Sequence, residues 1–203
     1  MNIFKRYYNI FPKYAVADAG YGSFNNYIFC ENNNIEKYMK FSMYNKLTKD
    51  KAYRENPYRV ENFRIENGKM YCPNNKEFTY QYSKHITGNK YGREYEVYEC
   101  KSCEGCPHKN KCTKSTGNRK VQLNKELNQY YIEVMNNLQS IHGALLLQNR
   151  SIQAEGTFGI IKYDRWYKRI VRREKLVQSE IFLVSIGYNI YKYHNKRNRI
   201  PPL

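Results

Sequence analysis

One short stretch near the N-terminus, residues 14–23, reads YAVADAGYGS. Its first four residues, 14–17, form an apolar run that is typical of a short buried strand. Asp18 follows directly, and the Ala-Gly-Tyr-Gly after it favours a tight turn. Ser23 is a good helix N-cap, so we expect a helix over about residues 24–31. A carboxylate at the end of an apolar strand stands where α/β sheets place reactive groups.

The next residues complete a strand–helix–strand unit. An asparagine cluster at residues 32–34 ends the expected helix, and residues 37–41 then alternate in polarity. Such alternation is typical of a strand. We therefore predict that residues 1–41 form one α/β piece with Asp18 at the end of its first strand.

Residues 42–120 differ in character from the sequence on either side. They are polar, rich in Lys, Asn and Tyr, and hold five of the six cysteines. Alternating segments at residues 78–82 and 95–98 indicate the two strands of a hairpin. These features predict an inserted, small β-rich module.

Helical periodicity returns in residues 121–203. Apolar residues spaced three and four apart, from Leu123 to Leu145, predict an amphipathic helix interrupted near Gly143. A second helical stretch is expected over about residues 147–163. A third helix is predicted from apolar residues on one face, namely Val177, Ile181, Val184, Tyr188 and Tyr191.

The composition indicates a polyanionic partner. The 203 residues carry 35 Lys and Arg against 18 Asp and Glu, a formal net charge of +17, and DNA or RNA is the first partner to expect. Codon bias toward AT-rich codons is an alternative source of this basicity. The sequence has no run of 18 apolar residues and its first residues do not resemble a secretory signal. We therefore expect a cytoplasmic protein with reduced cysteines and no contact with a membrane.

Two carboxylates and a lysine form the first candidate site. Glu155 lies within an expected helix, and Lys162 follows nearly two turns later, so both side chains are expected on one face. Ala154, Phe158 and Ile161 form the neighbouring apolar face, which we expect to pack against a sheet. A strand-end Asp and a helix Glu are the oxygen ligands that a divalent-metal phosphoryl-transfer site needs. By themselves, the same residues also fit a turn Asp and a solvated Glu–Lys pair.

Two motifs resemble those of bacterial insertion-sequence DDE transposases. Residues 18–26, DAGYGSFNN, look like the motif of the family's second aspartate, and residues 150–162, RSIQAEGTFGIIK, look like its final-glutamate helix. Residues 169–173 and 187–196 are similar to the closing helix of the family. The resemblance covers nearly the whole chain and includes the subgroup with a cysteine-bearing insertion before the glutamate.

The resemblance implies an enzyme that cuts and joins DNA with two metal ions on a ribonuclease-H-like fold. Asp18 and Glu155 would be the second Asp and the Glu of the acidic triad, with Mg²⁺ or Mn²⁺ as cofactor. Lys162 would be the lysine of the family's Glu-x6-Lys signature. The family's first aspartate lies on an earlier strand, and Asp50 and Asp164 lie in the wrong places to replace it. We therefore expect the C-terminal part of a transposase, with a partial ribonuclease-H-like fold, that is inactive alone.

The resemblance also implies the partners of such a protein. They are transposon ends and target DNA, with a homo-oligomer in the full-length protein and association with the bacterial nucleoid when bound to DNA. In the family's fold, strand 14–17 would pair in parallel with the strand of the first aspartate, and without that strand it would keep an open apolar edge. A non-catalytic DNA-binding zinc module and a decayed transposon remnant are the alternative interpretations.

The cysteines of residues 42–120 form the second candidate site. Tetrahedral Zn²⁺ takes four thiolate or imidazole ligands, and Cys-x2-Cys spacing presents two of them from one turn. We predict that four of the five thiols bind structural zinc, with His108 as a substitute ligand. An iron–sulfur cluster and unligated thiols are alternatives, and Cys30 is predicted to be a core residue. The five candidates are Cys72, Cys100, Cys103, Cys106 and Cys112.

Positive charge is concentrated in residues 151–203, with 11 Lys and Arg against 4 Asp and Glu. Such a surface binds phosphates, and the interleaved Trp166 and Tyr167 are able to stack on bases. A solvated helix face is the alternative for these charges, and for Trp166 we favour a core position under the last helix. Lys175 extends the basic run. The residues predicted to contact DNA are Arg150, Lys168, Arg169, Arg172 and Arg173.

Overall fold

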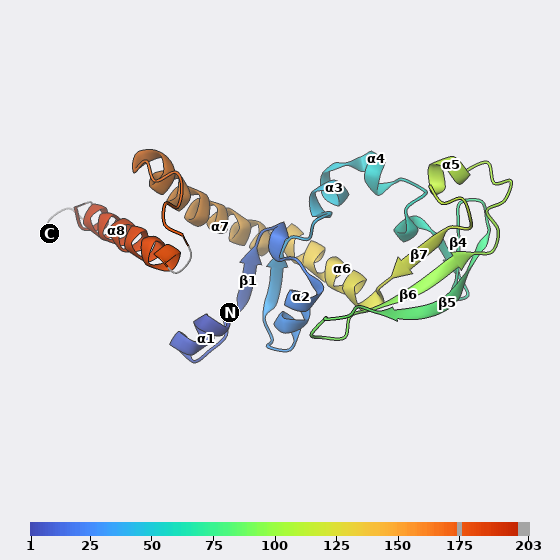
Figure 1. Cartoon of the computed structure of the whole chain (residues 1–203), viewed down its shortest axis with the longest axis horizontal. Helices are drawn as coiled ribbons and strands as arrows, with labels where there is room; N and C mark the ends of the chain where they lie inside the picture. Colours follow the sequence, from blue (N-terminus) through green and yellow to red (C-terminus); the bar gives the residue numbers. More distant parts are fainter. Residues whose placement is uncertain (174–175, 199–203) are drawn as a thin grey trace. The chain divides into compact units, whose positions relative to one another are not determined.

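Figure 1 shows the computed structural model of the 203-residue chain, in which residues 1–173 and 176–198 are described. The chain divides into two compact units, Met1–Leu147 and Gln148–Leu203, and each is described by itself. The architecture is mixed α/β, as the sequence predicts. The finer division at residues 41 and 120 stays a prediction.

The predicted strand–helix–strand unit is confirmed in the first compact unit. After a short helix α1 (Asn2–Tyr8), strands β1 (Tyr14–Ala17) and β2 (Glu36–Met39) pair in parallel, with α2 (Phe24–Glu31) as the connection. The Ser23 hydroxyl caps α2 by accepting a hydrogen bond from the backbone N–H of Asn26. In the described part of the chain no third strand joins this sheet, so β1 and β2 each keep one unpaired edge.

The hydrophobic core around this sheet is built from two distant parts of the chain. Both α2 and α6 (Lys125–Gln139) contact β2 (Figure 1). The buried ring of Phe41 stacks on Tyr131 of α6, with 4.1 Å between the ring centroids. The Tyr27 hydroxyl donates a hydrogen bond to the Met39 carbonyl at 2.9 Å. The core thus joins segments on either side of the β-rich part of the sequence.

A buried lysine, Lys37, joins the same two parts of the chain through ion pairs. Lys37 on β2 is only 3% exposed, and its Nζ donates hydrogen bonds to Glu31 and, at 2.9 Å, to Glu133 of α6. Burial lowers the pKa of Lys37, but the two carboxylates outweigh burial and the pKa is raised above its usual value. Because a buried ammonium is stable only when paired, this cluster ties α2 and α6 to β2.

A five-stranded antiparallel sheet follows in the order β3–β4–β5–β6–β7. The predicted hairpin strands are confirmed, because residues 78–82 and 95–98 lie in β5 and β6, which pair antiparallel. This sheet has a small core of its own, centred on Phe63 and Phe78. Its strands are β3 (Arg64–Glu66), β4 (Lys69–Tyr71), β5 (Glu77–His85), β6 (Glu94–Cys100) and β7 (Lys120–Leu123).

Short helical turns connect these elements. They are the 3₁₀ turn η1 (Ala19–Tyr21), α3 (Tyr44–Lys49), α4 (Lys51–Arg54), the 3₁₀ turn η2 (Val60–Asn62) and α5 (Lys109–Cys112).

The predicted helical interruption occurs three residues before the expected position. Helix α6 ends at Gln139 and α7 (Ile141–Gly159) begins after Ser140, whose hydroxyl accepts a hydrogen bond from the Gly143 N–H at 2.9 Å. Gly143 has no room for a side chain, since a Cβ atom there would lie 2.0 Å from the Asn137 carbonyl oxygen. The glycine therefore permits the close approach of the two helices, while Ser140 makes the break.

The second compact unit contains the rest of α7, a π-helical turn η3 (Ile160–Asp164) and α8 (Leu176–Asn198). The predicted helical stretch is confirmed, although its last turn is π rather than α. On α8 the predicted face is half-buried at four of its five positions, whereas Ile181 is 47% exposed. The Thr157 and Tyr188 hydroxyls lie 3.1 Å apart and link α7 to α8.

Candidate functional site

Asp18 lies directly after β1, as the sequence predicts, and is exposed to solvent. Its backbone carbonyl accepts a hydrogen bond from the Tyr21 N–H at 3.1 Å, which closes the turn η1. The strand end and the turn together hold this carboxylate at the carboxyl edge of a parallel strand pair. In α/β folds this edge is the usual place for a ligand.

The second glycine of the motif fixes where this turn lies. A Cβ atom on Gly22 would lie 2.1 Å from the Lys40 carbonyl oxygen and 2.7 Å from the Tyr27 hydroxyl. Only glycine therefore allows the turn to pack against the end of β2. Gly20 is different, because the nearest atom to a Cβ there is Asp18 Oδ1, at an ordinary contact distance of 3.8 Å.

Glu155 and Lys162 lie on consecutive helical segments of the second unit. Glu155 is exposed on α7, and Lys162 follows in the π-helical turn with its Nζ 5.8 Å from the centre of the Phe158 ring. A π turn changes the angle between successive residues. The α-helical spacing that predicted Glu155 and Lys162 on one face therefore does not apply across this turn. Phe158 is 59% exposed, whereas Ala154 and Ile161 are half-buried, and the packing of this face against a sheet stays a prediction.

The two acids belong to different compact units, Asp18 to the first and Glu155 to the second. Each lies on the element that the sequence predicts for it, a strand end and a helix. Their joint action on a metal ion stays a prediction.

The predicted DNA-contacting residues after the π turn lie in a loop that one carboxylate holds in place. Glu180 of α8 accepts hydrogen bonds from the Tyr167 hydroxyl at 2.5 Å, the Val171 N–H at 2.9 Å and the Arg172 N–H at 2.6 Å. The Tyr167 hydroxyl is the main reason that the pKa of Glu180 lies below its usual value. Lys175 lies outside the described residues. The exposed cations of this loop are Lys168, Arg169, Arg172 and Arg173.

Trp166 lies on the surface of this loop, so the prediction of a core position is wrong. The ring is 76% exposed, and the backbone of Trp166 has a positive φ of 56°. Lys168 Nζ lies 4.6 Å from the ring centre, a cation–π contact. An exposed indole beside cations is able to contact a nucleic acid base.

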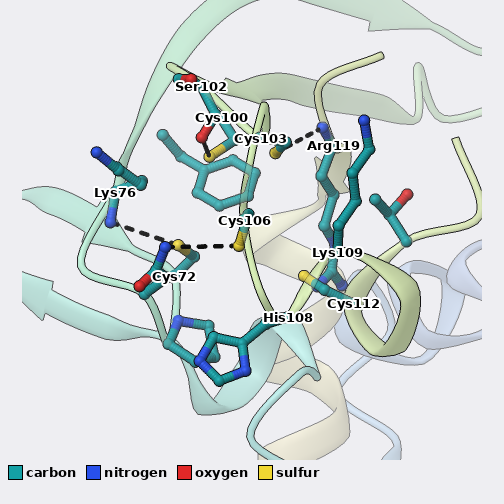
Figure 2. A pocket seen from close by; sticks show the side chains of 14 residues that line it. Cys72, Lys76, Cys100, Ser102, Cys103, Cys106, His108, Lys109, Cys112 and Arg119 are labelled. Carbon is teal, nitrogen blue, oxygen red and sulfur yellow. Dashed lines mark hydrogen bonds between the residues drawn. The ribbon is translucent and has the colours of Figure 1, made fainter. Parts of the chain in front are cut away.

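All five candidate cysteines line one small cavity beside the core of the five-stranded sheet (Figure 2). The cavity has a volume of about 20 Å³, enough for a single water-sized sphere. His108 also lines it, together with three cationic side chains, Lys76, Lys109 and Arg119. The sequence spacing therefore brings these thiols to one place, as the prediction of a common site requires.

Four of these sulfur atoms accept hydrogen bonds from N–H groups. Backbone N–H groups of Lys76 and Arg119 donate to Cys72 Sγ and Cys103 Sγ, each at 3.4 Å. Two side chains supply the others: Asn74 Nδ2 lies 3.5 Å from Cys106 Sγ, and Arg119 Nη1 lies 2.9 Å from Cys112 Sγ. Figure 2 shows these residues around the cavity.

The fifth cysteine of the cavity behaves differently. Cys100 is buried in the core of the sheet, and its thiol is a donor that points to the Ser102 carbonyl at 3.7 Å. Burial is the main reason that the pKa of Cys100 is raised to about 12. Cys30 is also buried, on α2, where burial raises the pKa to about 11, and its predicted core position is confirmed.

The side chains as placed do not form a metal-binding group. Within residues 1–173 and 176–198, no three Cys, His, Asp or Glu side chains lie close enough together to hold one ion. His108 Nδ1 lies 3.1 Å from the Tyr58 hydroxyl. Thiols are suitable ligands for zinc, but these side chains are not placed close enough together to bind one ion. Zinc binding stays a prediction.

Sequence reasoning missed Arg119, which contacts two of the cysteines. It precedes β7, and its neighbour Asn118 accepts a hydrogen bond from the Cys103 N–H at 2.9 Å. No local spacing rule connects this arginine to thiols seven and sixteen residues earlier. The one usable signal was a cationic residue close to a cysteine cluster.

Comparison with known families identifies the family of the chain. The profile of the transposase DDE domain matches residues 71–194, more than half of the chain. The chain belongs to the transposase DDE domain family. The match includes the cysteine cavity, Glu155 and Lys162, whereas Asp18 precedes it. No curated protein and no solved structure matches the chain significantly.

Membership of this family confirms the predicted resemblance to DDE transposases. Transposases act on DNA, and DDE enzymes use divalent metal ions for phosphoryl transfer. None of the helices in the described ranges has the length and apolar character needed to cross a bilayer. The match does not identify the insertion-sequence subgroup, which stays a prediction.

Proposed function

We propose that this chain forms the C-terminal part of a transposase catalytic domain, which cuts and joins transposon DNA by metal-dependent phosphoryl transfer. One observation carries the proposal: Asp18 ends a strand of a parallel unit, in a chain whose Glu155 segment matches the transposase DDE domain. The fold is proposed to be a partial ribonuclease-H-like fold. Its partners are transposon ends and target DNA, bound by a homo-oligomer of the full-length protein at the bacterial nucleoid.

Asp18 and Glu155 would hold Mg²⁺ or Mn²⁺ in this proposal. Both side chains are exposed carboxylates, and carboxylate oxygens are the ligands that these hard cations prefer. The bound metal would lower the pKa of a water or a DNA 3′-hydroxyl and stabilise charge on the transferring phosphate.

Cationic residues of the second unit would bind the DNA backbone beside the acid. Lys162 follows Glu155 in the π-helical turn after α7, and Arg150 precedes Glu155 on α7. The loop that Glu180 holds in place adds four exposed cations and the indole of Trp166. Phosphate contacts of this kind supply affinity and position the duplex without reading its sequence.

We infer that a polypeptide of these 203 residues does not cleave or join DNA alone. A DDE site needs a third carboxylate, and the sequence contains only two other aspartates. Asp50 caps α4 by accepting a hydrogen bond from the Tyr53 N–H at 2.9 Å, and Asp164 ends the π turn. Robust Mg²⁺- or Mn²⁺-dependent strand transfer by the purified 203-residue chain would contradict this inference.

We also propose that the cysteine cavity holds a structural zinc ion bound by four of its five thiols. The support is the chemistry of the donors, since several sulfurs around one small cavity are the ligands that zinc prefers. Zinc here would stabilise the β-rich module and take no part in the phosphoryl transfer.

The function is tested by strand transfer, with the first-aspartate segment of the domain supplied in trans. Asp18→Asn and Glu155→Gln are each expected to lower strand transfer about 10³-fold or more while DNA binding is retained. Asp164→Asn is the matched control, because it removes an exposed carboxylate nine residues from Glu155 and should leave the rate unchanged. Equal rates for all three variants, with DNA binding retained, would instead support a non-catalytic DNA-binding module.

A further inference from the structure

We propose which four of the five thiols bind the zinc ion, and that Cys100 is not among them. This inference rests on the structural zinc proposed above and goes beyond it by naming the ligands. The four ligands are Cys72, Cys103, Cys106 and Cys112.

The hydrogen bonds to sulfur separate these four residues from the fifth. Groups that hydrogen-bond to metal ligands orient those ligands around the metal site. Each of the four sulfurs accepts such a bond, from Lys76, Asn74 or Arg119. Cys100 instead uses its own proton to contact the Ser102 carbonyl, so its sulfur is a donor within the sheet core.

The two turns that carry three of these cysteines both contain left-handed backbone positions. In the first turn, Cys72 and Lys76 are joined by the Cys72 N–H and the Lys76 carbonyl at 2.9 Å, with Asn75 at a positive φ of 52°. In the second turn, Gly105 has a positive φ of 62° between Cys103 and Cys106. In the first turn this reversal of the chain lets the Lys76 N–H face the Cys72 sulfur.

The charges around the cavity also fit four thiolates. A zinc ion with four thiolates carries a net negative charge, which must be compensated when it is partly buried. Lys76, Lys109 and Arg119 line the cavity, and the Arg119 guanidinium already bonds to one of the sulfurs. Hydrogen-bond donors that contact the ligands of a metal, but not the metal itself, orient those ligands and tune their basicity.

Binding requires the thiols to move closer together, because as placed no three of the described side chains lie close enough to hold one ion. The cavity that they line accommodates one small sphere. His108 is not needed for a complete set of four, and its Nδ1 already bonds to the Tyr58 hydroxyl.

The first test counts zinc in the purified full chain, prepared without added metal. The proposal expects one zinc ion per chain in the wild type and in Cys100→Ala and His108→Gln. It expects almost none in serine variants of Cys72, Cys103, Cys106 or Cys112. Loss of zinc from Cys100→Ala to the same extent as from Cys103→Ser would overturn the assignment while leaving a zinc site. A fully folded, zinc-free wild type would overturn the zinc proposal itself.

A second measurement avoids variants that fail to fold. The zinc of the wild-type chain is replaced with Co²⁺, and the thiolate-to-cobalt charge-transfer band then reports how many thiolates bind. The assignment predicts the spectrum of a tetrahedral four-thiolate site. A spectrum of three thiolates and one imidazole, or of a six-coordinate oxygen site, would overturn it. Neither measurement depends on strand transfer, so failure of the transposase proposal is seen separately.

Discussion

Arg119 Nη1 lies 2.9 Å from Cys112 Sγ, while the backbone N–H of the same arginine donates to Cys103 Sγ at 3.4 Å. One residue at the start of β7 therefore supports two cysteines of the cavity. The guanidinium also lies 4.9 Å from the centre of the Phe63 ring, so it joins the cavity to the sheet core. A side chain of this kind would orient metal ligands rather than bind the metal itself.

Replacing Arg119 with Gln should therefore weaken zinc binding without abolishing it. The backbone N–H to Cys103 remains, but the charged donor to Cys112 is removed, and we expect an affinity lower by about 10–100-fold. Competition with a chromophoric chelator measures the change. Arg64→Gln is the control, because this arginine pairs with Glu66 on the same sheet and does not line the cavity. Equal affinities for both variants would show that Arg119 has no role at the site.

Gly22→Ala should destabilise the first unit, since a Cβ atom would meet the Lys40 carbonyl at 2.1 Å. We expect a loss of about 1–3 kcal/mol in the free energy of unfolding, typical of overpacking. Urea denaturation followed by far-UV circular dichroism measures it. Gly20→Ala serves as the matched control with an expected change below about 1 kcal/mol, because its nearest neighbour is 3.8 Å away. A tolerated Gly22→Ala would mean that the turn after Asp18 packs differently.

Acid should release the basic loop from α8. The pKa of Glu180 is lowered, chiefly by the hydrogen bond from Tyr167, so this carboxylate stabilises the folded loop at pH values above its unfolded pKa of about 4.5. The stabilisation is lost as pH falls through the lower, folded pKa. The only tryptophan, Trp166, lies in this loop, so its fluorescence anisotropy should fall below pH 4.5. Glu180→Gln should show low anisotropy at neutral pH; a pH-independent signal in the wild type would contradict the assignment.

The same loop should supply salt-dependent affinity for DNA. Arg172→Gln and Arg173→Gln are each expected to weaken duplex binding and to reduce the slope of log affinity against log salt by about 0.9 for each phosphate that the variant no longer binds. Filter binding at several salt concentrations measures the slope. Lys49→Gln, which removes an exposed cation from the first unit, is the control and should leave the slope unchanged. An unchanged slope in the arginine variants would place the DNA elsewhere.

Local signals in the sequence were enough to predict the elements around Asp18. The Ser23 cap, the asparagine cluster after the helix and the alternation in β2 act over a few residues, and the parallel unit follows from them. The β5–β6 hairpin was predicted for the same reason. In each case the deciding interactions are between near neighbours in the chain.

The sequence did not reveal three features, and their causes differ. The break between α6 and α7 occurs at Ser140 because its hydroxyl caps the new helix, whereas Gly143 only provides room for Asn137. Trp166 was expected as a core residue under the last helix, but it is 76% exposed in a loop whose Val171 and Arg172 N–H groups bond to Glu180. The spacing of the cysteines predicted a shared site but did not distinguish Cys100, whose burial depends on the sheet.

The most direct measurement of the central claim is metal-specific rescue at Glu155, with the first-aspartate segment supplied in trans. Glu155→Cys replaces an oxygen ligand with a thiolate, which binds Mg²⁺ poorly and softer cations better. We predict that strand transfer by this variant is lost in Mg²⁺ and partly restored in Mn²⁺, while Glu155→Ala stays inactive in both. Full activity of Glu155→Cys in Mg²⁺, or no restoration by Mn²⁺, would contradict a metal-binding role for Glu155.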